Sequence, residues 1–296
     1  MATFIMSYPG RRWRPSGAQD DGSPSAQRAL REWLLVCDHI TRVGGRIFVL
    51  DPPADQDAQP GLTYTARLGA LFPQAPGGAV FLLAPGEASE RVAPVLQGAG
   101  LLVQRATGSW NGQVDVAAIG RNRFILTYPE QSGREVLGQV HALLPPGARV
   151  MEFALSGEFS AGIDCLCPMT SPGNHQVLLL YASGLQGCTL EAIQAFAGPG
   201  IEVIPLNRED AMARACHALC VRGHLIIPVG LSSFLRGVLL RHGFPLIEVE
   251  LPELLGRGGG GPRCLVNDLP GFVVSDDAPT YALRREELQR LVDQYK

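Results

Sequence analysis

The residues best suited to chemistry lie in one short segment near the C-terminus, where Gly258–Gly261 precede Pro262, Arg263 and Cys264. Glycine accepts backbone conformations with positive φ and lets the chain approach a neighbouring group closely. A thiol placed just after such a turn is presented to a ligand, and its thiolate is a strong nucleophile. The alternative is a loop followed by a core thiol, because free cysteine is among the most buried residue types. We treat Cys264 as the candidate nucleophile.

The other cysteines do not predict a metal site. Cys165 and Cys167 would share one strand face, and Cys216 and Cys220 have no His/Cys partner pair at zinc-type spacing. Seven cysteines is an odd number, scattered without the density of a disulfide scaffold. This usage favours a reducing, cytoplasmic location, and we expect neither a metal nor a cofactor.

Composition excludes several function classes. The 296 residues suffice for one large domain or two ordinary ones, and 46% hydrophobic against 18% charged residues is typical of a globular protein. The net charge of −3 and the absence of a basic cluster beyond Arg11, Arg12 and Arg14 argue against nucleic-acid binding. No apolar run approaches the roughly 18 residues of a membrane-spanning helix, and the N-terminus lacks a secretory h-region.

Five segments have helical periodicity and plausible caps, and short apolar runs separate them. The first helix is expected to follow Ser25 and stop at Gly44, the second to run over about 87–98, and the third to follow Ser132 and end at Pro145. The fourth is expected to begin near Thr189 and stop at Gly198, and the fifth to follow Ser232 or Ser233 and end at Gly243. The expected strands include 46–50, 79–83, 114–119, 123–127, 177–181, 201–204, 224–229 and 246–249. This order predicts a repeat of ββαβ type. A dinucleotide-binding fold is disfavoured, because the glycines come late and do not open a helix.

Five such repeats followed by Gly-Gly-Gly-x-x-Cys resemble the pentein superfamily, which includes arginine deiminases, dimethylarginine dimethylaminohydrolases and amidinotransferases. Similar segments extend from Ser7-Tyr8-Pro9 to about Leu269, and include Trp33, 60–67, Gly112 with Asp115, and 162–164. The resemblance implies an α/β fold, a five-bladed αβ-propeller around a central pocket. It also implies a single domain over 1–296, with a C-terminal helix over 283–296, and a homodimer is compatible with it.

The resemblance further implies a reaction. In that family the cysteine attacks a guanidinium carbon, a histidine in a His-Leu-Asp strand protonates the leaving amine, and a glutamate in a Glu-Gly-x-Gly-Asp strand orients the histidine. Carboxylates bind the guanidinium, a planar cation with matching donors. In this sequence Cys264 matches the nucleophile, and Asp164 and Asp115 match the aspartates of the two motifs.

The remaining positions depart from the family pattern. Gly162 stands at the histidine position, Asn111 at the glutamate position, and Arg67 where the family has asparagine; segment 60–67 also lacks the guanidinium-binding carboxylate. Loss of general acid–base help costs about 10²–10⁴-fold in rate. Without the histidine we expect the Cys264 thiol to return toward a pKa of about 8.5, with only Arg67 to lower it. A positive Arg67 would also repel a guanidinium, so ordinary arginine deimination is disfavoured.

His217, expected on an apolar strand within 215–220, is the best substitute base, although a structural core histidine is the alternative interpretation. Two hypotheses follow. The first is a divergent amidinotransferase- or amidinohydrolase-like protein that binds a small guanidine, amidine or amine ligand at Asp164, Asp115, Asn111 and Arg67. It would cleave a C–N bond through Cys264, by hydrolysis or by transfer. The second is a catalytically inactive pentein that serves as a binding, regulatory or assembly protein.

Overall fold

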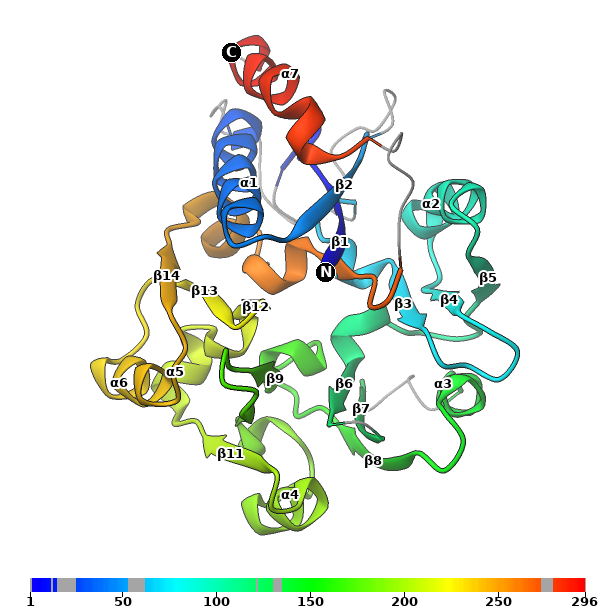
Figure 1. The fold of residues 1–296 in the computed structure, drawn as a ribbon, viewed down its shortest axis with the longest axis vertical. Helices are drawn as coiled ribbons and strands as arrows, with labels where there is room; N and C mark the ends of the chain where they lie inside the picture. Colours follow the sequence, from blue (N-terminus) through cyan, green and yellow to red (C-terminus); the bar gives the residue numbers. More distant parts are fainter. Residues whose placement is uncertain are drawn as a thin grey trace.

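Each sheet of the molecule repeats one unit: an antiparallel strand pair, a helix, and a third strand parallel to the second. The computed structural model describes residues 2–11, 13–14, 25–52, 62–120, 122–129, 135–272 and 279–295. Within these ranges it contains five three-stranded sheets. They surround a common centre as blades, and the helix of each blade lies on the outside of the ring (Figure 1). The predicted ββαβ repeat is therefore confirmed.

Four blades follow one another along the chain. Blade 1 is β3 (Gly69–Phe72), β4 (Val80–Leu83), α2 (Glu87–Gly98) and β5 (Leu102–Arg105), and blade 2 is β6 (Val116–Ile119), β7 (Arg123–Tyr128), α3 (Leu137–Leu143) and β8 (Arg149–Ala154). Blade 3 is β9 (Leu166–Thr170), β10 (Gln176–Leu180), α4 (Leu190–Ala197) and β11 (Ile201–Pro205). The short helix α5 (Arg208–Met212) leads to blade 4, which is β12 (Leu219–Val221), β13 (His224–Pro228), α6 (Ser233–Arg241) and β14 (Leu246–Val249).

Blade 5 is built from both ends of the chain and closes the ring. It consists of β15 (Asn267–Asp268), β1 (Thr3–Ser7), α1 (Ser25–Arg42) and β2 (Arg46–Leu50). β1 pairs antiparallel with β15, Phe4 opposite Asp268, and parallel with β2. The final helix α7 (Tyr281–Gln294) lies beside α1 (Figure 1), with Tyr281 edge-on to Trp33 at a centroid distance of 6.0 Å.

Local sequence features account for the helix boundaries. The side chain of Thr189 caps α4 by accepting the Ala192 N–H at 3.2 Å, and Ser232 caps α6 by accepting the Leu235 N–H at 3.1 Å. α1 is followed by Gly44 in the left-handed region at φ 85°, as is common after a helix C-terminus. These boundaries agree with the caps expected from the sequence.

Other expectations differ from the structure. α3 begins only at Leu137, and Ser132, its expected start, lies outside the described residues, as do Pro60 and Gly61. The segments 112–115, 162–164 and 215–217, expected as strands, are 3₁₀ turns. β5 was not among the predicted runs, because it is an outer strand whose residues are largely exposed and show no apolar alternation.

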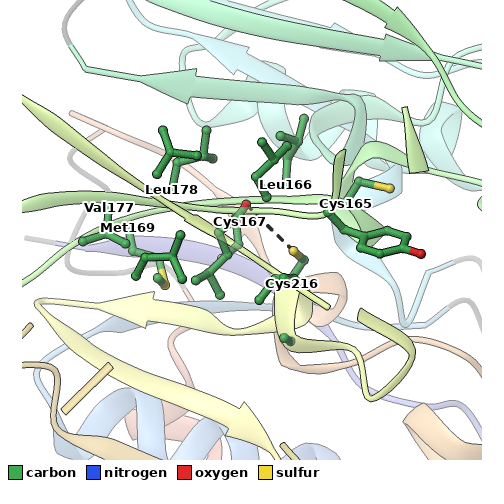
Figure 2. Packing of buried hydrophobic residues seen from close by; sticks show 14 of the residues in the cluster. Cys165, Leu166, Cys167, Met169, Val177, Leu178 and Cys216 are labelled. Atoms are coloured by element: carbon green, nitrogen blue, oxygen red, sulfur yellow. Dashed lines mark hydrogen bonds between the residues drawn. The ribbon is translucent and has the colours of Figure 1, made fainter. Parts of the chain in front are cut away.

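Several cysteines belong to the packing of blades 3 and 4. Cys165, Cys167 and Cys216 are buried among apolar side chains that include Leu166 and Leu178 (Figure 2). Burial raises the pKa of Cys167 to about 11, so its thiol stays protonated at neutral pH. Among the described residues, no group of three His, Cys, Asp or Glu side chains is placed to hold a metal ion. Nor is any described helix long and apolar enough to cross a membrane.

Candidate active site

One 3₁₀ turn leads into the inner strand of each blade, and neighbouring turns contact one another around the ring. The turns are Thr65–Arg67 before β3, Gly112–Asp115 before β6, Gly162–Asp164 before β9, Ala215–His217 before β12, and Pro262–Leu265 before β15. Each turn carries one candidate residue at or next to its last position, in chain order Arg67, Asp115, Asp164, His217 and Cys264. The fivefold repeat thus brings residues far apart in sequence to one end of the ring.

A cavity of about 480 Å³ opens at this end of the ring. Four of the candidate residues line it: Cys264, His217, Asp164 and Arg67. Tyr64, Glu158 and Arg214 also line it, whereas Asp115 and Asn111 do not. The four lining candidates can therefore contact a ligand in this cavity, whereas Asp115 and Asn111 lie behind its wall.

Cys264, His217 and Asp164 form a continuous chain along the cavity. The Sγ of Cys264 lies 3.6 Å from Nδ1 of His217, and Nε2 of His217 lies 2.8 Å from Oδ1 of Asp164. Cys264 is 4% exposed and His217 1% exposed, so water screens their interaction little. A thiol, an imidazole and a carboxylate in this order match the geometry by which a nucleophile is activated by a base that a third group orients.

Hydrogen bonds define the tautomer that His217 adopts when its ring is neutral. When the ring is neutral, its Nδ1 accepts the backbone N–H of Gly261 at 3.1 Å and carries no proton, and Nε2 donates to Asp164. The single lone pair of Nδ1 can accept only one hydrogen at a time. The hydrogen bond from the Gly261 N–H must therefore break before Nδ1 accepts the proton of Cys264.

The charges around Cys264 favour that proton transfer. Burial raises the pKa of the Cys264 thiol, but His217 and then Arg67 outweigh burial, and the pKa falls below its usual value. Burial likewise lowers the pKa of His217, but the Cys264 thiolate and Asp164 raise it to about 9. The expectation of an ordinary thiol pKa is therefore wrong, because the ring closure places His217 beside the sulfur.

Arg214 fixes both Asp164 and His217. Its guanidinium Nη1 donates to Oδ1 of Asp164 at 2.7 Å, and its carbonyl oxygen accepts the backbone N–H of His217 at 2.9 Å. Its backbone is left-handed at φ 63°, a conformation that arginine seldom adopts. Burial raises the pKa of Asp164, but His217 and Arg214 outweigh it and lower the pKa below its usual value. Asp164 is therefore ionised and already holds two donors.

Asp115 has a different environment. It is 2% exposed and accepts hydrogen bonds from the backbone and side chain of Asn111 at 3.2 and 3.0 Å, and from the Gly162 N–H at 3.2 Å. Burial raises its pKa to about 6, although these hydrogen bonds and Arg67 act against the rise. A side chain at Gly162 would overlap Thr127. In this conformation Asp115 and Asn111 link two neighbouring turns rather than facing the cavity.

The glycines before Cys264 mainly leave room for a neighbouring side chain, and only one of them supplies an unusual backbone angle. Of the four, only Gly259 has a positive φ, at 77°. A Cβ at Gly258 or at Gly260 would overlap the ring or hydroxyl of Tyr64, whose hydroxyl donates to the Leu254 carbonyl at 2.8 Å. The glycine segment thus packs directly on Tyr64, which forms one wall of the cavity.

Arg67 is the charged lining residue that keeps its side chain exposed without a hydrogen bond or ion pair to another described residue. Glu158 lies at the rim and pairs with Arg208 at 3.0 Å, and both side chains are exposed. The cavity therefore combines one unpaired cation with carboxylates that are already engaged.

Sequence reasoning missed Arg214, Tyr64 and Glu158. Arg214 occupies a left-handed position where glycine or asparagine is usual, so its type gave no indication of that backbone conformation. An alignment of the five repeats on their turns would have shown that His217 occupies the same position as Asp164 and Cys264.

Comparison with known proteins agrees with this architecture. No family model matches the chain, and no curated protein matches its sequence. Among solved structures, the N-terminal domain of ArgZ with a covalently bound reaction intermediate matches 90% of this chain and 97% of its own, at a TM-score of 0.74 and 20% identity. AgrE in complex with L-arginine matches 94% of this chain, at a TM-score of 0.76 and 20% identity, but the match spans only 41% of AgrE.

A histidine-to-glycine variant of dimethylarginine dimethylaminohydrolase, carrying an adduct with S-methyl-L-thiocitrulline, is also similar. It matches 90% of this chain and 99% of its own, at a TM-score of 0.67 and 17% identity. ArgZ is described as an arginine dihydrolase of the ornithine–ammonia cycle in cyanobacteria. Together these matches show that the chain has the pentein fold.

Proposed function

We propose that this protein is a cysteine-dependent enzyme that cleaves or exchanges a C–N bond of a small guanidine or amidine compound, with Cys264 as nucleophile. The observation that carries the proposal is the chain of Cys264, His217 and Asp164 along one cavity. The solved structures of the same fold support the substrate class, because those proteins act on guanidino compounds.

In the first half of the proposed reaction, Cys264 gives its proton to Nδ1 of His217. The thiolate then forms an S–C bond to the amidino carbon of the substrate. The C–N bond to the leaving amine breaks as His217 returns the proton to that nitrogen, and the amidino group remains on sulfur.

In the second half, His217 takes a proton from water, and the oxygen attacks the same carbon. The S–C bond breaks, and the sulfur leaves as the thiolate. A guanidine substrate yields a ureido product, and an amine acceptor in place of water yields a transferred amidino group. One histidine serves as acid and base in turn, the role that a buried imidazole beside a carboxylate can perform near neutral pH.

The remaining lining residues limit the substrate. Asp164 already holds His217 and Arg214, so its role in the proposal is to orient the base rather than to bind a guanidinium alone. Arg67 lies near enough to lower the pKa of Cys264 and repels a second cation at the same place. We therefore propose that a substrate whose carboxylate can face Arg67 is preferred over a guanidinium or amidinium cation without an anionic group, such as agmatine or benzamidine.

The test is intact-mass analysis after incubation with arginine, dimethylarginine, agmatine and benzamidine, combined with assays for ureido product and released amine. We expect a covalent adduct or turnover with at least one compound, lost in Cys264→Ala. We expect His217→Asn to lower the rate about 10²-fold or more, the usual cost of removing a general acid–base. Neither adduct nor turnover with any of the four compounds would contradict the proposal for this substrate class.

The second hypothesis, an inactive pentein with a binding, regulatory or assembly role, is favoured by one observation. Gly162 and Asn111 stand where the family pattern has its catalytic histidine and glutamate, and Asn111 and Asp115 hydrogen-bond to each other outside the cavity. The second hypothesis predicts that a ligand binds reversibly, that no covalent adduct forms, and that Cys264→Ala leaves the binding unchanged.

A further inference from the structure

A second cavity, of about 780 Å³, lies at the opposite end of β12 from His217. His217 precedes the first residue of β12, whereas Arg222 follows its last residue and lines this second cavity. The cavity lies between blade 4, which contributes the β12–β13 turn and the start of β14, and blade 5, which contributes the end of α1. It is therefore a separate site from the one that contains Cys264.

Four basic residues line this cavity: His39, Arg42, Arg222 and His224. No lining residue is acidic. The neighbouring Asp38 on α1 is engaged elsewhere, since it accepts from Arg285 at 2.8 Å and from Tyr281 at 2.8 Å. Within the described part of the chain, no carboxylate inside the cavity balances the charges of Arg42 and Arg222.

Both histidines that line the cavity have a buried ring nitrogen without a hydrogen-bond partner among the described residues. This nitrogen is Nδ1 in His39 and in His224. An unpartnered buried nitrogen is tolerated better as a bare acceptor than as an N–H, so the proton of each neutral ring belongs on Nε2. Nε2 is then the ring nitrogen of each histidine that can donate a hydrogen bond to a ligand. Burial and then Arg42 lower the pKa of His39, and the neighbouring Asp38 opposes them only in part.

The backbone at Arg222 is strained. It has φ 50° and is followed by Gly223 at φ 83°, so the pair forms the tight turn between β12 and β13. Turns of this kind prefer asparagine or glycine at the first position, and arginine seldom adopts the left-handed conformation. The Arg222 guanidinium lies over Gly44, where a side chain would overlap it. Among the described residues Arg222 has no ion-pair partner, so its charge is free to meet a ligand.

We propose that this cavity binds a small organic phosphate. Its phosphate group would accept hydrogen bonds from Arg42, Arg222 and the two histidines, and its organic part would contact Leu246 and Ile247, which form the apolar wall. Arginine forks and imidazole N–H groups suit phosphate oxygens, and a ligand with three or more anionic oxygens matches a cavity that offers donors only. The site is independent of the function proposed for Cys264.

The test is calorimetric titration of the full chain with inorganic phosphate, pyrophosphate and ATP at constant ionic strength. We expect saturable binding of at least one probe, weakened about tenfold or more in Arg222→Gly and in Arg42→Gln, since a hydrogen bond to a charged group contributes about 1.5–3 kcal/mol. Arg222→Gly is the sharper variant, because glycine accepts the left-handed backbone and the unliganded protein should lose no stability.

Cys264→Ala and Arg67→Gln are the matched controls, and we expect both to bind as the unaltered protein does. No saturable binding of any probe in the millimolar range would overturn the proposal. Binding that Arg67→Gln abolishes and Arg222→Gly leaves intact would place the phosphate at the Cys264 cavity and would overturn it as well.

Discussion

At the scale of single residues, the reactivity of Cys264 is determined by its neighbours rather than by exposure. The thiol is buried, which alone would keep it protonated, but His217 lies 3.6 Å away and Asp164 holds the far side of the imidazole. Two cysteines elsewhere lack such neighbours. Burial raises the pKa of Cys188 to about 11, and burial also raises the pKa of Cys220.

This contrast predicts selective alkylation. At neutral pH, where a lowered pKa leaves more thiolate, we expect iodoacetamide to modify Cys264 faster than Cys188 or Cys220, although both are more exposed. In His217→Asn the thiol loses its main cationic partner, so the midpoint of the alkylation rate against pH should move upward. Peptide mass spectrometry over a pH series measures both effects. Equal rates at Cys264 and Cys188 would contradict the assigned thiolate.

At the scale of elements, the turn before each inner strand determines which side chains meet. The Pro262–Leu265 turn follows glycines that pack on Tyr64, and Thr65 in the first turn donates to the Leu265 carbonyl at 2.7 Å. The glycine segment therefore holds the nucleophile's turn against blade 1. The run of four glycines is explained by close packing at three positions, Gly258 and Gly260 against Tyr64 and Gly261 against His217, and by left-handed backbone at Gly259.

A pair of glycine substitutions tests this packing. Gly260→Ala should destabilise the fold by about 1–3 kcal/mol, because the new methyl group overlaps the Tyr64 ring. Gly256→Ala is the control, since its Cβ would meet no atom within 4 Å. Chemical denaturation measures both, and Tyr64→Ala should remove most of the Gly260→Ala effect by vacating the space. An equal loss of stability for the two alanines would show that close packing is not the cause.

At the scale of the whole molecule, the ring is closed by two residues of β15 that pair with β1. Asn267 is 1% exposed and joins blade 5 to blade 1, because its side-chain amide donates to the carbonyl of Thr65 at 3.0 Å and of Gly69 at 2.8 Å. The same closure carries Cys264, three residues earlier in the chain, to its place beside His217.

Removing this link should weaken the closed ring. Asn267→Ala leaves two buried carbonyl groups without that donor, and we expect a loss of about 1–3 kcal/mol in unfolding free energy, together with slower alkylation of Cys264. Asn122→Ala is the matched control, because its amide makes one hydrogen bond, to the Gly147 carbonyl at 2.8 Å, in an exposed setting. Similar losses for the two variants would argue that Asn267 has no special role in closure.

The repeat and most candidate residues could be predicted before any tertiary contact was known. Helix periodicity and caps such as Thr189 and Ser232 report local preferences that survive in the fold. They sufficed to predict five ββαβ units, whereas the glycine segment singled out Cys264 and the resemblance to the pentein superfamily singled out Asp164 and Asp115. Edge strands such as β5 escaped prediction because their exposed residues carry no pattern of burial.

The contacts among those residues, in contrast, depend on how the blades pack together. Whether His217 meets Cys264, 47 positions away, depends on the angle at which five blades close, and no local pattern encodes that angle. The same closure turned Asp115 toward Gly162 and brought Arg214 onto Asp164. Side-chain pairing across blades is a property of the packed ring, because contacts between distant segments form only when the whole chain buries its apolar faces together.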